Sequence, residues 1–399
     1  MNISSEAIDT PPNITVNNSR LFLVLFLGVL AAIGPFVMDL YLPALPSVVT
    51  YFDTSMPTVQ LSLTSCMVGL AVGQLIIGPL SDKYGRKMPL LICIGIFALS
   101  GIGIVMAENM QSLISFRFLQ GISSAGGVVI ARAAAADLYE GPEMARFFAL
   151  LMSVNGVAPI IAPVIGSLLL EITDWRGVFV FQAGLGILLF MACLRFQESL
   201  SINKRHDGEI VSSYMNYLAI MKNGPFMLLT GVLSFMTAGL VAYIAASPFI
   251  FQEHYQLSSM AFSLIFSFNA AGFALGAYIA SKLSQKAGVK FGIISSVIVG
   301  VALYILVMTN GSLWLVEICL FAYGFNYGVL APGASSLAIA MERKYAGSAS
   351  AVAGFFPFLM GALVSPLVGI GDSFVSTGFI MFISTVLTFL TWLFARKNI

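Results

Sequence analysis

The sequence predicts an all-α membrane protein with twelve transmembrane helices in two six-helix halves. Three observations predict this fold: a composition too apolar for a soluble protein, apolar segments of transmembrane length, and one long polar stretch that divides those segments six and six. Of the 399 residues, 58% are hydrophobic and 9% are charged, and the mean hydropathy is +0.94. Soluble domains carry about 25% charged residues. The net charge of +1 gives no reason to expect a nucleic-acid partner.

The apolar segments have the length of transmembrane helices, since about 20 helical residues cross a hydrocarbon core of about 30 Å. Glycine and proline are frequent inside them, as expected where membrane helices pack closely and kink. The predicted spans are 21–49, 58–80, 89–107, 111–134, 146–170, 177–197, 225–250, 259–281, 291–309, 312–340, 347–370 and 374–395.

The basic residues predict the orientation of the chain, because cytoplasmic loops are enriched in Lys and Arg. If the N-terminal tail is cytoplasmic, Arg176 falls outside and Arg117 falls within a span, so the other 17 of the 19 Lys and Arg residues lie on the cytoplasmic side. Both termini are therefore expected in the cytoplasm. The predicted units are the tail 1–20, the first half 21–197, a cytoplasmic linker 198–223 and the second half 224–399.

An internal repeat relates the two halves when the chain is shifted by 203 residues. A parallel repeat of two six-span halves is typical of secondary transporters, which hold the substrate site between the halves near the bilayer midplane. The matching pairs are Gly69 with Gly272, Gly73 with Gly276, Lys83 with Lys286, Gly85 with Gly288, Lys87 with Lys290, Gly121 with Gly324, Pro163 with Pro366 and Gly166 with Gly369.

The sequence carries no recognisable catalytic or metal-binding motif. The four cysteines lie in apolar segments without CxxC spacing, so they predict neither disulfides nor a metal site. His206 and His254 are the only histidines, and the chain has no HExxH motif and no GxxxxGK(S/T) phosphate-binding loop. We therefore expect no enzyme activity, no metal, no cofactor and no ATP-driven step.

Asp39 is the first candidate functional residue, because it interrupts a long uncharged segment. Residues 21–38 and 40–49 carry no charge, and together they exceed the roughly 20 residues that cross a bilayer. A carboxylate inside a membrane is costly and usually faces a cavity or a partner. The position fits a proton or cation site in a transport path, and it also fits an acid held by water at the outer membrane edge.

Arg117 lies in the outer part of the fourth span, where a lone arginine is costly unless it is paired. Asp39 is the acid expected at a similar depth, so we predict that the two face each other across a central cavity. This contact fits proton coupling, or a permanent ion pair that fixes two helices. Glu317 is a second candidate for coupling, or an acid at the outer interface. Arg132 and Asp137 are predicted to form a structural or gating pair.

The loop after the second span has the composition of a gate. It lies on the predicted cytoplasmic side between two helix ends, and its glycines allow a tight turn. An acid here can accept charge-assisted hydrogen bonds from a helix end or an arginine, and such a pair can lock one conformation and release in another. An ordinary basic loop is the simpler explanation. The predicted gating residues of this loop are Gly78, Asp82, Gly85, Arg86 and Lys87.

Aromatic residues and methionines are abundant enough to build an adaptable apolar cavity. The chain has 32 Phe, 13 Tyr, 3 Trp and 19 Met, and such side chains accommodate varied apolar ligands. Most of them are expected to face lipid or other helices. Polar side chains inside spans usually face a cavity, so the predicted substrate-binding residues are Tyr41, Asn155, Tyr243, Asn269, Tyr323, Asn326 and Tyr327.

The loop of residues 78–87 resembles the signature loop of the major facilitator superfamily. Arg117, with Gln120 and Gly121, is similar to the fourth-span Arg-x-x-Gln-Gly motif of that family. The segment 38–46, MDLYLPALP, resembles the first-span signature of the Bcr/CflA branch of bacterial drug/proton antiporters. The fifth span carries an imperfect copy of the motif typical of proton-coupled antiporters, formed by Gly156, Pro159, Pro163 and Gly166.

The resemblance implies a major facilitator fold and proton-driven efflux of small, mostly apolar drugs or metabolites across the bacterial inner membrane by alternating access. The implied partners are protons, a small-molecule substrate and the lipid bilayer, with the proton gradient as energy source and a monomer as the active form. In the implied mechanism a proton from outside binds Asp39 and weakens its pairing with Arg117, the halves rock, and the loop 78–87 latches the outward-facing state. The alternative is a proton-coupled importer of a nucleoside-like metabolite on the same fold.

Overall fold

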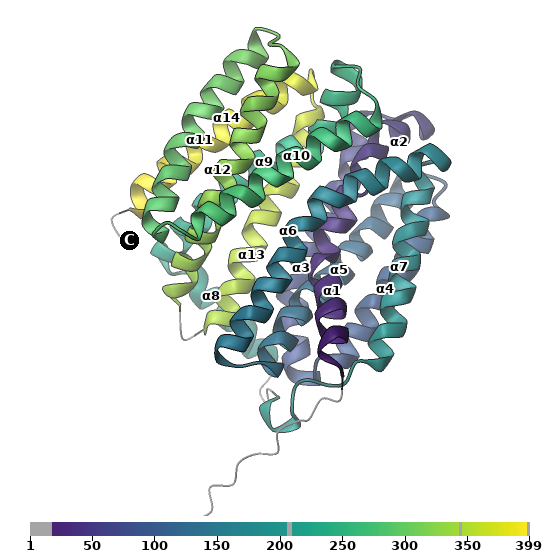
Figure 1. Cartoon of the computed structure of the whole chain (residues 1–399), viewed down its shortest axis with the longest axis vertical. Helices are drawn as coiled ribbons and strands as arrows, with labels where there is room; N and C mark the ends of the chain where they lie inside the picture. Colours follow the sequence, from purple (N-terminus) through teal and green to yellow (C-terminus); the bar gives the residue numbers. More distant parts are fainter. Residues whose placement is uncertain (1–17, 206–209, 343–344, 397–399) are drawn as a thin grey trace, which may run out of the picture.

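A computed structural model describes residues 18–205, 210–342 and 345–396. Residues 1–17 of the predicted tail, 206–209 of the predicted linker and three of the basic residues used for orientation, Arg343, Lys344 and Lys397, lie outside these ranges. The described chain contains twelve helices long and apolar enough to cross a membrane (Figure 1). The predicted fold class and number of spans are therefore confirmed.

The first half contains six of the spans. The first span, Arg20–Tyr51, is interrupted once, so it consists of one long helix followed by two short elements. Its elements are α1 (Arg20–Asp39), η1 (Leu42–Ala44), α2 (Leu45–Tyr51), α3 (Met56–Tyr84), α4 (Lys87–Val105), α5 (Met110–Leu138), α6 (Gly141–Ile172) and α7 (Trp175–Arg195).

The second half repeats this plan after a connecting region that holds η2 (Ile202–Lys204) and α8 (Ile210–Met221). Figure 1 shows its green to yellow helices beside the purple to teal helices of the first half. Its elements are α9 (Gly224–Phe249), η3 (Ile250–His254), α10 (Ser259–Ala280), α11 (Gln285–Met308), α12 (Leu313–Ala340), α13 (Ala346–Val364), η5 (Ser365–Gly369) and α14 (Ser373–Ala395).

The two faces of the bundle follow from the alternating direction of the helices. We call the face that holds the start of α1 and the end of α14 the terminal face, and the other the opposite face. The halves meet along two helix pairs, α3 with α13 and α6 with α10. A site between the halves would therefore lie between these two lines of contact.

The internal repeat recurs as equivalent helix contacts. A Cβ on Gly73 of α3 would lie 2.8 Å from the carbonyl oxygen of Ile122 on α5, and a Cβ on Gly276 of α10 would clash with the carbonyl oxygen of Phe325 on α12. Ile122 and Phe325 are separated by the same offset as the two glycines. Membrane helices use glycine where their backbones approach this closely.

The helix α8 lies within the segment predicted as a polar linker, whose residues 210–221 are mostly apolar. It packs against α13 and α3. The hydroxyl of Tyr217 donates a hydrogen bond to the carbonyl oxygen of Leu75 on α3, at 3.3 Å. Burial raises the pKa of Tyr217, so this hydroxyl stays protonated. The connection between the halves is thus itself docked on the first half.

Candidate functional site

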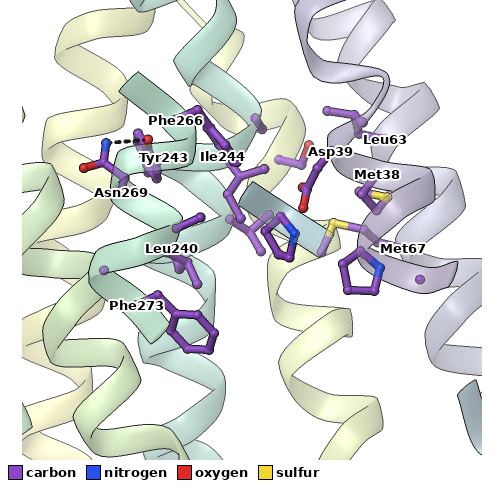
Figure 2. Close-up of a pocket in the computed structure, with 18 of the residues that line it drawn as sticks. Met38, Asp39, Leu63, Met67, Leu240, Tyr243, Ile244, Phe266, Asn269 and Phe273 are labelled. Carbon is purple, nitrogen blue, oxygen red and sulfur yellow. Dashed lines mark hydrogen bonds between the residues drawn. The ribbon is translucent and has the colours of Figure 1, made fainter. Parts of the chain in front are cut away.

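A central cavity of about 220 Å³ lies between the two halves (Figure 2). Its walls come from α1, α3 and α6 on one side and from α9, α10, α12, α13 and η5 on the other. Most of the lining is apolar, and it comprises Gly34, Pro35, Met38, Asp39, Leu63, Met67, Leu70, Pro159, Leu240, Val241, Tyr243, Ile244, Ala245, Phe266, Asn269, Ala270, Phe273, Gly324, Phe358 and Ser365.

Asp39 is the charged residue of this cavity and occupies the last position of α1. Its side chain lies among Met38, Leu63 and Met67, as Figure 2 shows. Only 6% of the residue is exposed. Among the described residues, none donates a hydrogen bond to its carboxylate or forms an ion pair with it. The arrangement leaves Asp39 free to exchange a proton or to meet a ligand.

Arg117 does not face Asp39, so the predicted contact between them is wrong in this conformation. Arg117 is fully buried inside the first half and does not line the central cavity. Its Nη1 donates to the carbonyl oxygen of Val37 at 3.3 Å and to Oε1 of Gln120 at 2.7 Å, and its Nε donates to the carbonyl oxygen of Ser62 at 3.4 Å. The guanidinium therefore joins α5 to α1 and α3 through neutral acceptors.

The local backbone explains why Arg117 binds the end of α1. The amide of Tyr41 donates to the carbonyl oxygen of Met38, three residues earlier, which leaves the carbonyl of Val37 available. Arg117 fills that vacancy together with Nε2 of Gln182 on α7, which donates to the same oxygen at 3.3 Å. The guanidinium also lies 5.0 Å from the ring centre of Tyr41, a distance typical of a cation–π contact. Arg117 thus holds the turn that carries Asp39.

Two glutamines complete this buried network. Nε2 of Gln120 donates to Oε1 of Gln182 at 2.9 Å, and both side chains are fully buried. Gln182 was not among the predicted site residues. A lone glutamine inside an apolar span was the available signal, because buried polar groups need partners.

The second half contributes a polar cluster of Tyr243, Asn269 and Glu317. Nδ2 of Asn269 donates to the hydroxyl of Tyr243 at 2.8 Å and to Oε2 of Glu317 at 3.2 Å. Tyr243 and Asn269 line the central cavity, as predicted for substrate contacts, whereas Glu317 lines a separate cavity of about 530 Å³ between α10 and α12. Glu317 is 6% exposed, so it is not simply a solvated interfacial acid.

The other five predicted substrate residues lie outside the central cavity. The hydroxyl of Tyr41 contacts Oγ of Ser62 at 3.2 Å inside the first half, and the hydroxyl of Tyr323 donates to the carbonyl oxygen of Met236 at 3.3 Å. Asn326 is 2% exposed and lines none of the cavities described. The remaining pair, Asn155 and Tyr327, line a second cavity of about 290 Å³.

Two more cavities continue from the central one toward the terminal face. The second cavity shares Pro35, Leu70 and Phe358 with the central cavity. A third cavity of about 440 Å³ shares Gln74 and Arg132 with the second. Shared lining residues mean that the cavities adjoin, so they follow one another between the halves from Asp39 toward the terminal face.

The halves contact each other closely near the opposite face. The hydroxyls of Ser167 on α6 and Ser263 on α10 lie 2.6 Å apart, and Ser263 also donates to the carbonyl oxygen of Pro163 at 2.9 Å. Ser267 donates to the carbonyl oxygen of Ile160 at 2.6 Å. The halves are therefore joined by hydrogen bonds near the opposite face, beside a surface cavity of about 540 Å³, and they are separated by the adjoining cavities toward the terminal face.

The fifth-span motif lies along this contact. A Cβ on Gly166 would clash with the carbonyl oxygen of Leu40, so this glycine lets α6 pack directly against the end of α1, beside Asp39. Pro159 lines the central cavity. A Cβ on Gly156 would have no neighbour within 4 Å beyond its own turn of helix, so its packing gives no reason for glycine. Three of the four motif residues thus contact either the cavity or the helices that close it.

The predicted gating loop forms an ion-pair cluster at the terminal face. Nε of Arg86 donates to Oδ2 of Asp137 on α5 at 2.8 Å, and its Nη1 bonds to Asp82 and to Oγ of Ser81. Burial lowers the pKa of Arg86, but the hydrogen bonds and charges of Asp137 and Asp82 outweigh it and keep the guanidinium charged. The cluster ties α3 to α5 within the first half.

The predicted pair of Arg132 and Asp137 is wrong. Asp137 accepts from Arg86 and from Oγ of Ser199, at 3.2 Å. Nε of Arg132 is buried and has no hydrogen-bond partner among the described residues. Arg132 instead lines the second and third cavities, because its position on α5 turns it toward the gap between the halves.

Glu198 completes the cluster and was missed by the sequence analysis. Its Oε1 accepts from the amide of Arg86 at 2.8 Å and its Oε2 accepts from the amide of Lys87 at 3.1 Å, which caps the start of α4. Gly85 has a φ of +89°, a region that favours glycine, and a Cβ there would lie 2.5 Å from Oε2 of Glu198. Arg205 lies 3.7 Å from the same carboxylate. In the sequence Glu198 is only an acid that follows the sixth span, and nothing in its neighbours indicates that it caps the start of α4.

A comparison with protein families decides the class of the protein. The model of the Major Facilitator Superfamily matches residues 24–366. The chain belongs to the major facilitator superfamily. Its family and fold are those of membrane transporters, not of enzymes. The protein is thus a multi-pass transporter, in agreement with the resemblance inferred from the sequence.

Several named relatives are similar along most of this major facilitator chain. It is 37% identical to the uncharacterized MFS-type transporter YdgK of Bacillus subtilis, over 92% of this chain and 94% of that one. It is 27% identical to a bicyclomycin resistance protein homolog of Haemophilus influenzae, over 88% and 89%, and 27% identical to the multidrug transporter MdfA of Escherichia coli O6:H1, over 81% and 80%. The nucleoside transporter NupG shares the fold, with a TM-score of 0.74 at 13% identity, over 94% of this chain and 99% of that one.

Proposed function

We propose that this protein exports small, mostly apolar drugs or metabolites across the bacterial inner membrane in exchange for protons. Both termini lie in the cytoplasm, the chain acts as a monomer, and the proton gradient drives transport without a cofactor. The relatives named for bicyclomycin resistance and multidrug transport support efflux. The strong excess of Lys and Arg on the terminal side supports the orientation.

The position of Asp39 is the observation that carries the proposal. It is a carboxylate in an apolar cavity between the two halves, with no cation paired to it among the described residues. A charge in such a place is costly, so a proton or a cationic or hydrogen-bond-donating ligand is favoured there. If the proton and the substrate compete for Asp39, binding of one favours release of the other. Such competition produces exchange.

The cavities supply the route. With the terminal face in the cytoplasm, this conformation is inward-facing, and the path past Tyr327 and Arg132 connects Asp39 with the cytoplasm. Substrate enters by this path and displaces the proton from Asp39. The halves then rock, the contacts between Ser167 and Ser263 separate, and the cavity opens outward. A proton from outside resets Asp39.

Import of a nucleoside-like metabolite is less well supported by the cavity. A nucleoside presents many hydrogen-bonding groups, and a site that binds it needs matching partners. The polar side chains of the central cavity are those of Asp39, Tyr243, Asn269 and Ser365. The likeness to NupG rests on the shared fold alone.

Everted membrane vesicles test the proposal. A drug panel identifies substrates by the growth of expressing cells, and each substrate is then added to vesicles that hold an inward proton gradient. We expect substrate to collapse the gradient in wild-type vesicles and not in Asp39→Asn. Glu108→Gln, at an exposed acid, is the matched control. Exchange at the wild-type stoichiometry in Asp39→Asn refutes the role of Asp39, and proton-dependent uptake into whole cells refutes efflux.

A further inference from the structure

We propose that Tyr243, Asn269 and Glu317 form a second substrate contact, a polar subsite whose hydrogen-bonding character is set by a proton on Glu317. This inference rests on the proposed function, because it describes the same cavity. It differs from the role of Asp39, since the three residues belong to the second half. The subsite takes the polar group of an otherwise apolar, aromatic ligand.

The geometry shows a chain of groups from Glu317 to the cavity. Asn269 donates through the same nitrogen to Glu317 at 3.2 Å and to Tyr243 at 2.8 Å, and Figure 2 shows the second of these bonds at the cavity wall. The three residues come from three helices, α12, α10 and α9. A change in the orientation of the Asn269 amide therefore changes its hydrogen bonds to both Glu317 and Tyr243.

Within this cluster of Tyr243, Asn269 and Glu317, three hydrogen-bonding groups have no partner among the described residues. Oδ1 of Asn269 and Oε1 of Glu317 are buried acceptors that receive no hydrogen bond. The hydroxyl of Tyr243 accepts from Asn269, and no described residue accepts the proton of that hydroxyl. Asn269 and Glu317 are only 3% and 6% exposed. Buried polar groups are normally satisfied, so an unsatisfied set of this kind indicates a missing ligand or proton.

The two protonation states of Glu317 favour opposite orientations of the Asn269 amide, because only the protonated acid can donate to the amide oxygen. An ionised carboxylate only accepts, so the amide N–H turns to it and to Tyr243, and the proton of Tyr243 is then free for a ligand acceptor. A protonated Glu317 donates, so the amide oxygen turns to it. Tyr243 then donates to that oxygen, and its lone pairs face the ligand. The nitrogen and oxygen of an amide exchange places with little change in shape.

Few other charges act on Glu317. Within their described bounds, α9, α10 and α13 carry no charged residue, and Tyr243 is the titratable group of α9 that joins the chain. The charged residues of α11, Lys286 and Lys290, lie at its terminal end, whereas Glu317 lies near the opposite face. Asp39 lies across the cavity on α1. The hydrogen bond from Asn269 is thus the polar contact that the described residues make with the Glu317 carboxylate.

Glu317 lines a cavity that shares no lining residue with the central cavity of Asp39. Glu317 lies four residues after Leu313, the start of α12, which is a rise of about 6 Å. The cavity that it lines opens between α10 and α12 beside exposed Trp314 and Phe268. Trp at this position is typical of a membrane–water interface. The two acids therefore line separate cavities, and Glu317 lies nearer the opposite face.

Two neutral probes of similar size test the subsite directly. Benzophenone offers a hydrogen-bond acceptor and diphenylamine offers a donor, and neither gains a charge in the buffers used. Binding is measured to protein reconstituted in lipid, in acidic and in alkaline buffer. In wild type we expect benzophenone to bind about threefold to tenfold tighter in alkaline buffer and diphenylamine to show the reverse, which is the effect of about one hydrogen bond.

The variants separate this subsite from the site at Asp39. Glu317→Gln and Tyr243→Phe are expected to abolish the opposite pH trends of the two probes, whereas Asp39→Asn retains them. Persistence of the trends in Glu317→Gln, their loss in Asp39→Asn, or failure of both probes to bind wild type overturns the inference. Proton exchange in Asp39→Asn vesicles decides the proposed function independently of these outcomes.

Infrared difference spectra between the two buffers test the switch without any ligand. We expect two carboxylic-acid bands, one lost in Glu317→Gln and the other in Asp39→Asn. A tyrosine C–O band that is removed by Tyr243→Phe should shift with pH in wild type and in Asp39→Asn, and it should stay fixed in Glu317→Gln. A Tyr243 band that ignores pH, or that shifts in Glu317→Gln, overturns the coupling.

Discussion

Replacing Arg117 by lysine keeps the buried charge but removes the planar donor group, so it separates two roles of this residue. If Arg117 acts by charge on Asp39, Arg117→Lys should preserve transport. If Arg117 acts by holding α1 and α3 through its hydrogen bonds, Arg117→Lys should impair transport. One ammonium cannot donate to Val37, Ser62 and Gln120 together as a guanidinium does. We predict the second result.

The structure gives the size of the effect. Arg117 makes two hydrogen bonds to the backbones of other helices, at the carbonyl oxygens of Val37 and Ser62. Interhelical hydrogen bonds in membranes contribute about 0.6 kcal/mol on average and up to about 1.7 kcal/mol. Losing both costs about 1 to 3 kcal/mol. The end of α1 also loses its anchor, so Asp39 should become less well positioned and exchange should slow.

Unfolding in mixed micelles with rising SDS measures this cost, and vesicle assays at matched expression measure exchange. Arg20→Lys is the control, since 64% of the Arg20 side chain is exposed and such surface changes stay within about 0.5 kcal/mol. Wild-type stability in Arg117→Lys would refute the idea that the hydrogen bonds of Arg117 hold these helices together. Wild-type stability together with wild-type exchange would return Arg117 to a role through its charge.

Three further substitutions give distinct outcomes in the same assays. Gly73→Ala should lower stability by about 1 to 3 kcal/mol by overpacking α3 on α5, whereas Gly184→Ala, with open space at its Cβ, should not; equal effects would contradict this. Glu198→Gln should slow transport with unchanged substrate affinity, because it weakens the cluster around Arg86; a changed affinity would contradict it. Tyr217→Phe should cost about 0.5 to 1.5 kcal/mol for one hydrogen bond, and no change would show that α8 is not held there.

The sequence was sufficient for the fold because the bilayer restricts it so strongly. A hydrocarbon core admits helices of about 20 apolar residues and little else, so predicted span 374–395 nearly coincides with α14. The deviations have local causes. α6 begins at Gly141, before predicted span 146–170, because Pro142 in its first turn favours a helix start beyond the apolar run. The first span bends near Pro43, whose missing amide interrupts the helix.

The site was predicted less completely, because its partners include backbone atoms. The sequence located Asp39, and its burial argues against the alternative of an acid held by water at the membrane edge. It could not show that Arg117 binds the carbonyl oxygen of Val37, since that oxygen becomes available only through a turn in the folded chain. The preference of Asp137 for Arg86 over Arg132 likewise depends on how α3 and α5 face each other.

Under the proposed function, the separation of Asp39 from Arg117 explains how exchange avoids a proton leak. A permanent ion pair would let the cavity close at every step, since its charge would be balanced. An ionised Asp39 without a cation instead makes closure costly, because both halves would have to enclose an unpaired charge in apolar surroundings. A bound proton or a suitable ligand removes that cost. The halves can therefore rock only when one of them is present, which couples the two opposite fluxes.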